Sequence, residues 1–121
     1  MWSFSQSSGE LSHDGVYVAT GYAGNGDGKN NPVMQDVVGV GPLPQGKYTI
    51  EGPPYHHPHL GPCVMNLTPA DDNEMFGRSL FRIHGDSKSD PGNASKGCIV
   101  LPRSVREQVW NSEDRYLEVT V

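Results

Sequence analysis

Cysteine is scarce in this sequence, since the 121 residues contain only Cys63 and Cys98. Two cysteines are too few for a disulfide framework or for a cysteine-rich structural zinc site. We expect both to be free thiols. Cys63 opens the apolar segment "CVMNL", so we expect it to pack in the core or at a sheet edge.

Long apolar runs and a surplus of basic charge are also missing. No stretch of 18 apolar residues occurs, which excludes a transmembrane helix. The opening "MWSFSQSSGE" lacks the basic and apolar regions of a secretory signal peptide, so we expect none. The 9 Lys and Arg face 14 Asp and Glu, giving a net charge of −5. A chain this acidic is not expected to bind nucleic acid or to insert into a membrane.

Glycine and proline are abundant instead. The chain has 15 Gly and 10 Pro, about a fifth of its residues, and only 35% of its residues are hydrophobic. This composition argues against a helical bundle and favours many short strands joined by turns around a small core. The length fits one domain over residues 1–121.

Alternating residues at the N-terminus predict a small antiparallel meander. Trp2 and Phe4 alternate with serines, which is the period of a half-buried strand. The segments 10–13 and 16–20 flank Asp14-Gly15, a strong hairpin signal.

The rest of the chain predicts further strands and one helix. The predicted strands are 46–52, 63–69, 79–85, 97–101 and 116–121. Segment 102–115 carries Val105, Val109 and Trp110 at helical spacing, and Ser104 is its expected N-cap. The fold class is therefore mainly β with one short helix near the C-terminus.

Two loops stand out. Segment 21–46 holds seven Gly and three Pro, and so long a loop is typically functional or tightly self-packed. The segment "PPYHHPHLGP" places His56, His57 and His59 in a Pro-rich loop. Such histidines can bind zinc or copper, but no matching ligand cluster occurs elsewhere. We favour a surface loop that lines a cleft, without a bound metal.

Chemistry is best placed in segment 83–102, where a strand ends in His84-Gly85 and "SKGC" brings Cys98 to the next strand. A cysteine acts as a nucleophile when its pKa is lowered or when a base lies beside it, and His84 is the candidate to pair with it. The N–H groups around Gly97 and Cys98 could form an oxyanion hole. All five His precede Cys98, which excludes the Cys-before-His order of papain-like enzymes.

These residues also carry a family resemblance. His84-Gly85 followed by "SKGCIVL" resembles the His-Gly…Ser-x-Gly-Cys signature of L,D-transpeptidases, the cysteine enzymes of bacterial peptidoglycan. The segments "WSFSQSSGELSHDG", "TGYAGNGDGKNNP" and "VGPLPQGKYTI" resemble the compact L,D-transpeptidase effectors delivered by type VI secretion. The resemblance covers nearly the whole chain and implies an L,D-transpeptidase-like β-sandwich or barrel.

The resemblance implies a role for each motif residue. Cys98 would be the nucleophile and His84 its base, while Ser95 and Gly97 shape the turn and Gly85 shapes the cleft behind His84. No metal or organic cofactor is implied.

The sequence departs from the family pattern at one position. Many L,D-transpeptidases continue Gly-Cys-Ile-Arg, whereas Val100 stands here in place of the arginine. Arg82 and Arg103 are the candidates to bind the substrate in its place, with Arg78 as a further one.

The function implied by the resemblance is cleavage or exchange at the tetrapeptide stem of peptidoglycan through a cysteine thioester. The protein would be an antibacterial type VI effector, made in the cytoplasm and acting in the periplasm of a target bacterium. Its expected partners are stem peptides, a cognate immunity protein and a secretion-system spike or adaptor. Two alternatives stay open: a sortase-like transpeptidase that uses Arg103 or Arg106 as its arginine, and a non-catalytic module that binds cell wall or metal.

Overall fold

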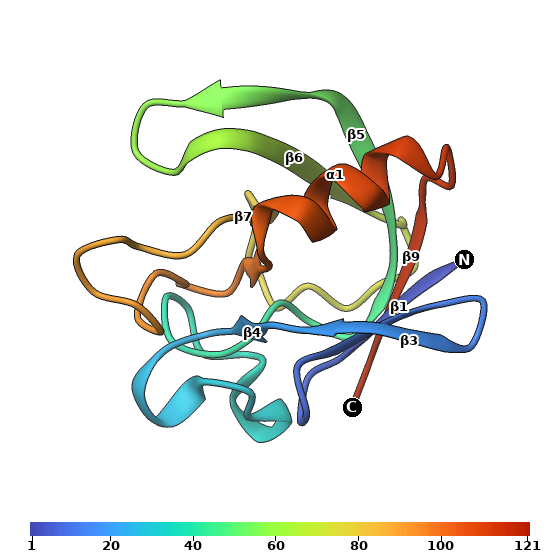
Figure 1. Cartoon of the computed structure of the whole chain (residues 1–121). Helices are drawn as coiled ribbons and strands as arrows, with labels where there is room; N and C mark the ends of the chain where they lie inside the picture. Colours follow the sequence, from blue (N-terminus) through green and yellow to red (C-terminus); the bar gives the residue numbers. More distant parts are fainter.

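A computed structural model describes all 121 residues of the chain. The structure has one sheet of nine strands in the order β3-β2-β1-β9-β5-β6-β7-β8-β4 and one α-helix (Figure 1). The strands are β1 (Trp2–Ser5), β2 (Glu10–His13), β3 (Val16–Thr20), β4 (Tyr22–Ala23), β5 (Gly46–His57), β6 (Gly61–Pro69), β7 (Arg82–His84), β8 (Ile99–Val100) and β9 (Tyr116–Thr120). The predicted mainly β fold with one short helix near the C-terminus is confirmed.

The two edges of the sheet meet at Gly21. Strands β3 and β4 lie at opposite edges, yet Gly21 alone separates them along the chain, so the sheet must curl back on itself (Figure 1). The Gly21 N–H donates to the Gly9 carbonyl at 2.8 Å on one side. On the other side, a Cβ at Gly21 would lie only 2.0 Å from the Val100 carbonyl oxygen. The absence of a side chain therefore lets the curled sheet close into a nearly complete barrel.

The core fills the inside of this curl with side chains from most strands. The predicted N-terminal meander is confirmed, with Trp2 and Phe4 almost fully buried and Trp2 paired to His13 across β1 and β2. The hairpin turn falls at Asp14 and Gly15, both of which have positive φ, as a two-residue hairpin requires.

The helix α1 (Arg103–Asn111) is shorter than predicted and begins differently. Pro102 is the N-cap, and its carbonyl accepts the first helical N–H groups, so the expectation that Ser104 caps the helix was wrong. Val109 is buried against the sheet, as its helical spacing predicted. No helix is long and apolar enough to cross a membrane.

The Pro- and His-rich segment, predicted as a loop, mostly belongs to strands β5 and β6, and only residues 58–60 form a turn. Its end, from His59 to Pro62, lines a cleft as predicted. Strand β5 runs through His57, because β6 supplies partners opposite Tyr55 and His57, with register shifts around the prolines. The His57 Nδ1 accepts hydrogen bonds from the backbone N–H groups of His59 and Leu60, which closes the hairpin turn.

Strands β7 and β8 are shorter than the predicted 79–85 and 97–101, because only two residues of each strand pair with the other.

Candidate functional site

The two neighbouring strands β7 and β8 bring His84 and Cys98 to one face of the sheet. They pair in parallel, with Ile83 opposite Ile99, and both isoleucines are buried in the core. Since side chains alternate along a strand, His84 and Cys98 point to the opposite face. The Arg82 N–H donates to the Cys98 sulfur at 3.3 Å. No hydrogen bond joins that sulfur to the His84 imidazole.

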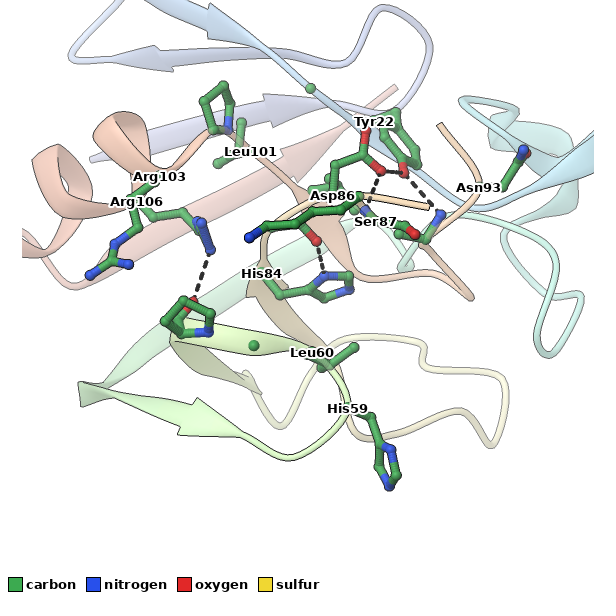
Figure 2. Close-up of a pocket in the computed structure, with 18 of the residues that line it drawn as sticks. Tyr22, His59, Leu60, His84, Asp86, Ser87, Asn93, Leu101, Arg103 and Arg106 are labelled. Carbon is green, nitrogen blue, oxygen red and sulfur yellow. Dashed lines mark hydrogen bonds between the residues drawn. The ribbon is translucent and has the colours of Figure 1, made fainter. Parts of the chain in front are cut away.

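His84 is oriented by the residue that follows it. Its ring is 2% exposed, and its Nδ1 lies 2.8 Å from the Gly85 carbonyl oxygen (Figure 2). A carbonyl only accepts, so Nδ1 carries the proton and Nε2 is the free basic nitrogen. Burial lowers the pKa of His84, and the nearby charges of Arg106 and Arg82 lower it further. The imidazole is therefore neutral at pH 7 and able to accept a proton.

Cys98 is a thiol in this state rather than a thiolate. Burial raises the pKa of Cys98, and the Arg82 N–H with the charges of Arg82 and Arg78 offsets this only in part. A half-buried neutral thiol and a buried neutral imidazole differ from the pairing of thiolate and histidine expected from the sequence.

Ser95 holds the turn that leads into Cys98. Its buried hydroxyl donates to the Cys98 carbonyl at 2.6 Å and accepts the N–H groups of Gly24 at 2.8 Å and Gly97 at 3.0 Å. Because the Gly97 N–H is used inside the turn, it is not free for an oxyanion. Of the two N–H groups expected there, that of Cys98 remains.

Gly97 is required by the close packing around this turn. Its φ is +137°, and a Cβ would lie 2.7 Å from the Arg78 guanidinium and 2.8 Å from the Phe81 ring. Arg78 is 7% exposed and donates to four backbone carbonyls at 2.6 to 3.2 Å. These carbonyls belong to Gln35, Gly41, Pro42 and Lys96. All four of these bonds come from the two terminal nitrogens of Arg78, so its guanidinium holds the scaffold together.

The Gly- and Pro-rich segment 21–46 also forms hydrogen bonds to the turn at residues 95–97. The Asn25 side chain donates to the Ser95 carbonyl at 2.9 Å and to the Gly39 carbonyl at 2.7 Å. The Leu43 N–H donates to the Gly97 carbonyl at 2.9 Å. The segment was expected to be functional or tightly self-packed, and its internal bonds from Asn25 to the Gly39 and Val40 carbonyls show the packing.

A cleft of about 1020 Å³ opens beside His84 (Figure 2). Its walls come from the β5–β6 turn, from the loop after β7, from β4 and from α1. Of the residues predicted for the site, His84, Gly85 and Arg103 line it, whereas Cys98 and Arg82 do not. Cys98 lies one position before β8, and the cleft extends from His84 toward the far end of that strand.

The two predicted substrate-binding arginines have different surroundings. The Arg82 side chain donates to the Tyr55 hydroxyl at 3.2 Å and to the Leu80 carbonyl at 3.3 Å, close to Cys98. Arg103 stands exposed on the rim of the cleft, with its Nε 3.2 Å from a Glu107 carboxylate oxygen.

Sequence reasoning missed a pair that ties down the loop between His84 and Cys98. The Tyr22 hydroxyl donates to Asp86 at 2.6 Å and accepts the Ala94 N–H at 3.0 Å, and burial raises the pKa of Tyr22 to about 12. Asp86 also accepts the N–H groups of Ser87 and Gly92, and these bonds with that of Tyr22 lower its pKa against the effect of burial. The sequence signal was an aspartate at the start of a polar loop, which favours local capping. No local sequence pattern indicated that Tyr22 would contact this loop.

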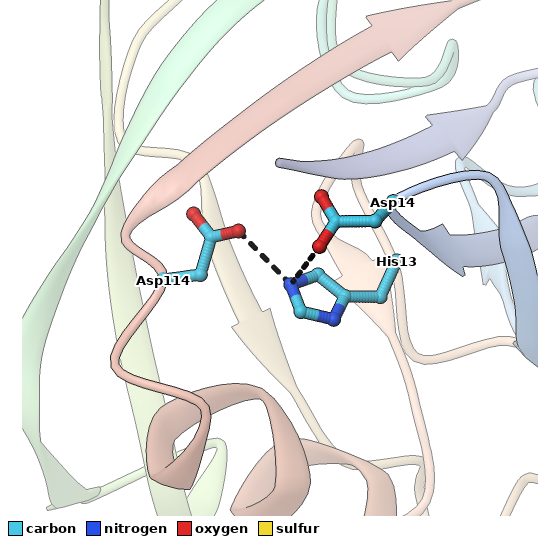
Figure 3. Close-up of side chains that lie close together, drawn as sticks. All are labelled: His13, Asp14 and Asp114. Carbon is cyan, nitrogen blue, oxygen red and sulfur yellow. Dashed lines mark hydrogen bonds and ion pairs between the residues drawn. The ribbon is translucent and has the colours of Figure 1, made fainter.

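The histidines expected to be able to bind metal do not converge. His56, His57 and His59 lie along the β5–β6 hairpin, and the rings of His57 and His59 are 6.0 Å apart. The one group of potential ligands within 4.8 Å of one another is His13, Asp14 and Asp114 (Figure 3).

The two aspartates of this group already form ion pairs with the N-terminal ammonium of the chain. The Met1 ammonium lies 2.6 Å from an Asp14 oxygen and 2.7 Å from an Asp114 oxygen. His13 contacts Asp114 at 2.9 Å and stacks on Trp2. The cluster anchors the N-terminus to the segment before β9.

Comparison with known proteins assigns most of the chain to one family. No curated protein matches the sequence. The family model of the Tlde1 domain, a type VI secretion effector domain, matches residues 17–120, which include most of β3, all of β4 to β9 and the whole His84–Cys98 region. The chain therefore belongs to the Tlde1 domain family of type VI secretion effectors.

Proposed function

We propose that residues 1–121 form a single catalytic domain, a cysteine acyltransferase that shortens or exchanges the end of peptidoglycan tetrapeptide stems. The observation that carries the proposal is the arrangement of His84 and Cys98. His84 ends β7, Cys98 directly precedes the adjacent strand β8, and His84, whose Nε2 has no hydrogen-bond partner, lines a cleft large enough for a peptide. Membership of a family of type VI effectors supports an antibacterial toxin.

The reaction begins with attack of Cys98 on the carbonyl of the L-centre of meso-diaminopimelate. His84 Nε2 removes the thiol proton as the C–S bond forms, because both groups are neutral beforehand. The Cys98 N–H is the donor left to stabilise the oxyanion.

Collapse of the tetrahedral intermediate breaks the bond to D-alanine. The His84 imidazolium returns its proton to the departing amine, and a thioester remains on Cys98. Water then gives a tripeptide, which is L,D-carboxypeptidase activity. The amine of a D-amino acid gives an exchanged tetrapeptide, which is L,D-transpeptidase activity.

The proposed site of action is the periplasm of a target bacterium, where the stems are accessible. Loss of tetrapeptide donors would weaken the wall of that cell. The proposed partners are a cognate immunity protein in the producing cell and a spike or adaptor of the secretion system, both of which fit the family.

Mass spectrometry of tetrapeptide muropeptides incubated with the enzyme and D-methionine tests this proposal. We expect loss of D-alanine and replacement by D-methionine for the wild type and for Cys63→Ala, which removes the other cysteine as a matched control. Cys98→Ala and His84→Gln should each lower the rate by orders of magnitude, since nucleophile and base act as a unit. Unchanged turnover by Cys98→Ala would refute the proposal.

A further inference from the structure

We propose that Arg106 binds a substrate carboxylate in the cleft beside His84, namely that of the amino acid that leaves and of the D-amino acid that replaces it. This inference rests on the proposed acyl transfer and adds the group that recognises its leaving and entering partners. Arg106 projects from α1 and lines the cleft (Figure 2).

Arg106 is buried without a counter-ion. It is 5% exposed, and no carboxylate of the chain forms an ion pair with it. One terminal nitrogen reaches the carbonyls of Pro62 at 3.2 Å and Cys63 at 3.4 Å, and the buried Nε has no hydrogen-bond partner. A guanidinium stays charged when buried, and such charges are normally paired. The structure thus holds a cation whose hydrogen-bonding capacity is largely unused.

The other buried arginine shows what a purely structural role looks like in this fold. Arg78 is 7% exposed, close to the value for Arg106, yet it makes four hydrogen bonds of 3.2 Å or less to backbone carbonyls. It also does not line the cleft. The contrast singles out Arg106 as the buried arginine that is free to take an anion.

Arg106 lies directly against the residue that orients the base. A Cβ on Gly85 would be 2.8 Å and 2.9 Å from the two terminal nitrogens of Arg106, and the Gly85 carbonyl accepts from His84 Nδ1. The positive charge of Arg106 is also a cause of the lowered pKa of His84. The guanidinium and the imidazole therefore both lie beside Gly85 on the wall of the cleft.

This position matches the geometry of the leaving group. His84 must deliver its proton to the departing amine, so the leaving amino acid lies on the His84 side of Cys98. The amine and carboxylate of an α-amino acid are attached to one carbon. A carboxylate held by the forked guanidinium thus places the amine near His84 Nε2, on departure and again on entry of a new D-amino acid.

The other charged groups on the cleft walls are already occupied or remain in solvent. The Asp86 carboxylate is taken up by Tyr22 and by backbone N–H groups. Arg103 is exposed and faces Glu107, and Lys88 is exposed. Arg103 is accordingly the matched control for Arg106, being on the same helix and the same cleft.

The test compares a tetrapeptide that ends in the free D-alanine carboxylate with the same peptide ending in the carboxamide. The wild type should lose about 10- to 100-fold in kcat/KM on amidation, the worth of one charged hydrogen-bonded pair. Arg106→Gln should lose a similar factor on the carboxylate substrate and no longer discriminate between the two peptides. Arg106→Lys should recover part of the discrimination, and Arg103→Gln should keep all of it.

Equal turnover of both peptides by the wild type would overturn the inference, and this comparison needs no variant to fold. Full discrimination by an active Arg106→Gln would also overturn it. A merely structural role would instead lower the rates on both peptides by the same factor and leave their ratio at the wild-type value. If the wild type turned over neither peptide, the proposed function itself would fail, and the assignment of Arg106 with it.

Discussion

Replacement of Ser95 by alanine is the sharpest test of how the turn before Cys98 is built. The hydroxyl is 2% exposed and joins three backbone groups at 2.6, 2.8 and 3.0 Å. Ser95→Ala leaves the N–H groups of Gly24 and Gly97 without this acceptor, and the Cys98 carbonyl loses its donor.

The expected loss of stability follows from these three bonds. A buried polar group left unsatisfied costs about 1–3 kcal/mol. Ser95→Ala leaves two N–H groups and one carbonyl without their hydrogen-bond partner. Allowing for some relaxation of the turn, this should lower the free energy of unfolding by about 2–5 kcal/mol. That is a large part of the roughly 5–15 kcal/mol that stabilises a typical domain.

Urea denaturation followed by tryptophan fluorescence measures this change. Ser89→Ala is the matched control, because Ser89 is exposed in the same loop and its side chain has one 3.2 Å contact, to Ser87. We expect the control to stay within about 0.5 kcal/mol of the wild type. If Ser95→Ala were as stable as Ser89→Ala, the hydrogen-bonded turn would not be what holds Cys98 in place.

The neutral state of His84 and Cys98 gives further expected results. Because burial lowers the pKa of His84 below 6.5, the fall of kcat/KM on the acid side should be centred below pH 6.5, and a fall centred above 6.5 would contradict this. Because burial raises the pKa of Cys98 above 9.0, alkylation by iodoacetamide should accelerate up to pH 9 and beyond, and a rate that levels off below pH 8 would indicate a thiolate. Gly97→Ala should lower the free energy of unfolding by about 2–5 kcal/mol, since its Cβ would collide with Arg78 and Phe81; a urea midpoint equal to that of the wild type would refute the packing described.

Local patterns predicted the first three strands and the last strand, but missed β4. The alternation at Trp2 and Phe4 and the turn at Asp14-Gly15 are short-range signals, and each was sufficient for its element. The prolines after Gly52 pointed to a loop, but cross-strand pairing with β6 overrides that preference and extends β5 to His57. The closure of the sheet at Gly21 depends on contacts between opposite edges, which no local sequence pattern predicts.

The residues of the candidate site could be predicted where they lie close together in the sequence. His84, Ser95, Gly97 and Cys98 fall within one motif, and the structure places His84 at the end of β7 and Cys98 directly before the parallel strand β8. Arg106 lies on a helix beyond the motif, and its lack of a counter-ion becomes visible only once the fold is known.

The support from segment 21–46 is likewise long-range. The Asn25 side chain and the Leu43 N–H reach the 95–97 turn from a part of the chain whose composition indicated only a loop. The protonation states of His84 and Cys98 depend on burial, which the sequence does not specify.

Capture of the acyl-enzyme tests the central claim most directly. Wild-type protein is mixed with tetrapeptide muropeptide, quenched in acid within the first turnovers, digested and mapped by mass spectrometry. We predict a thioester-linked tripeptide stem on Cys98, none on Cys63, and no adduct in Cys98→Ala. Release of D-alanine with the Cys98 thiol unmodified, together with undiminished turnover by Cys98→Ala, would contradict the proposed mechanism.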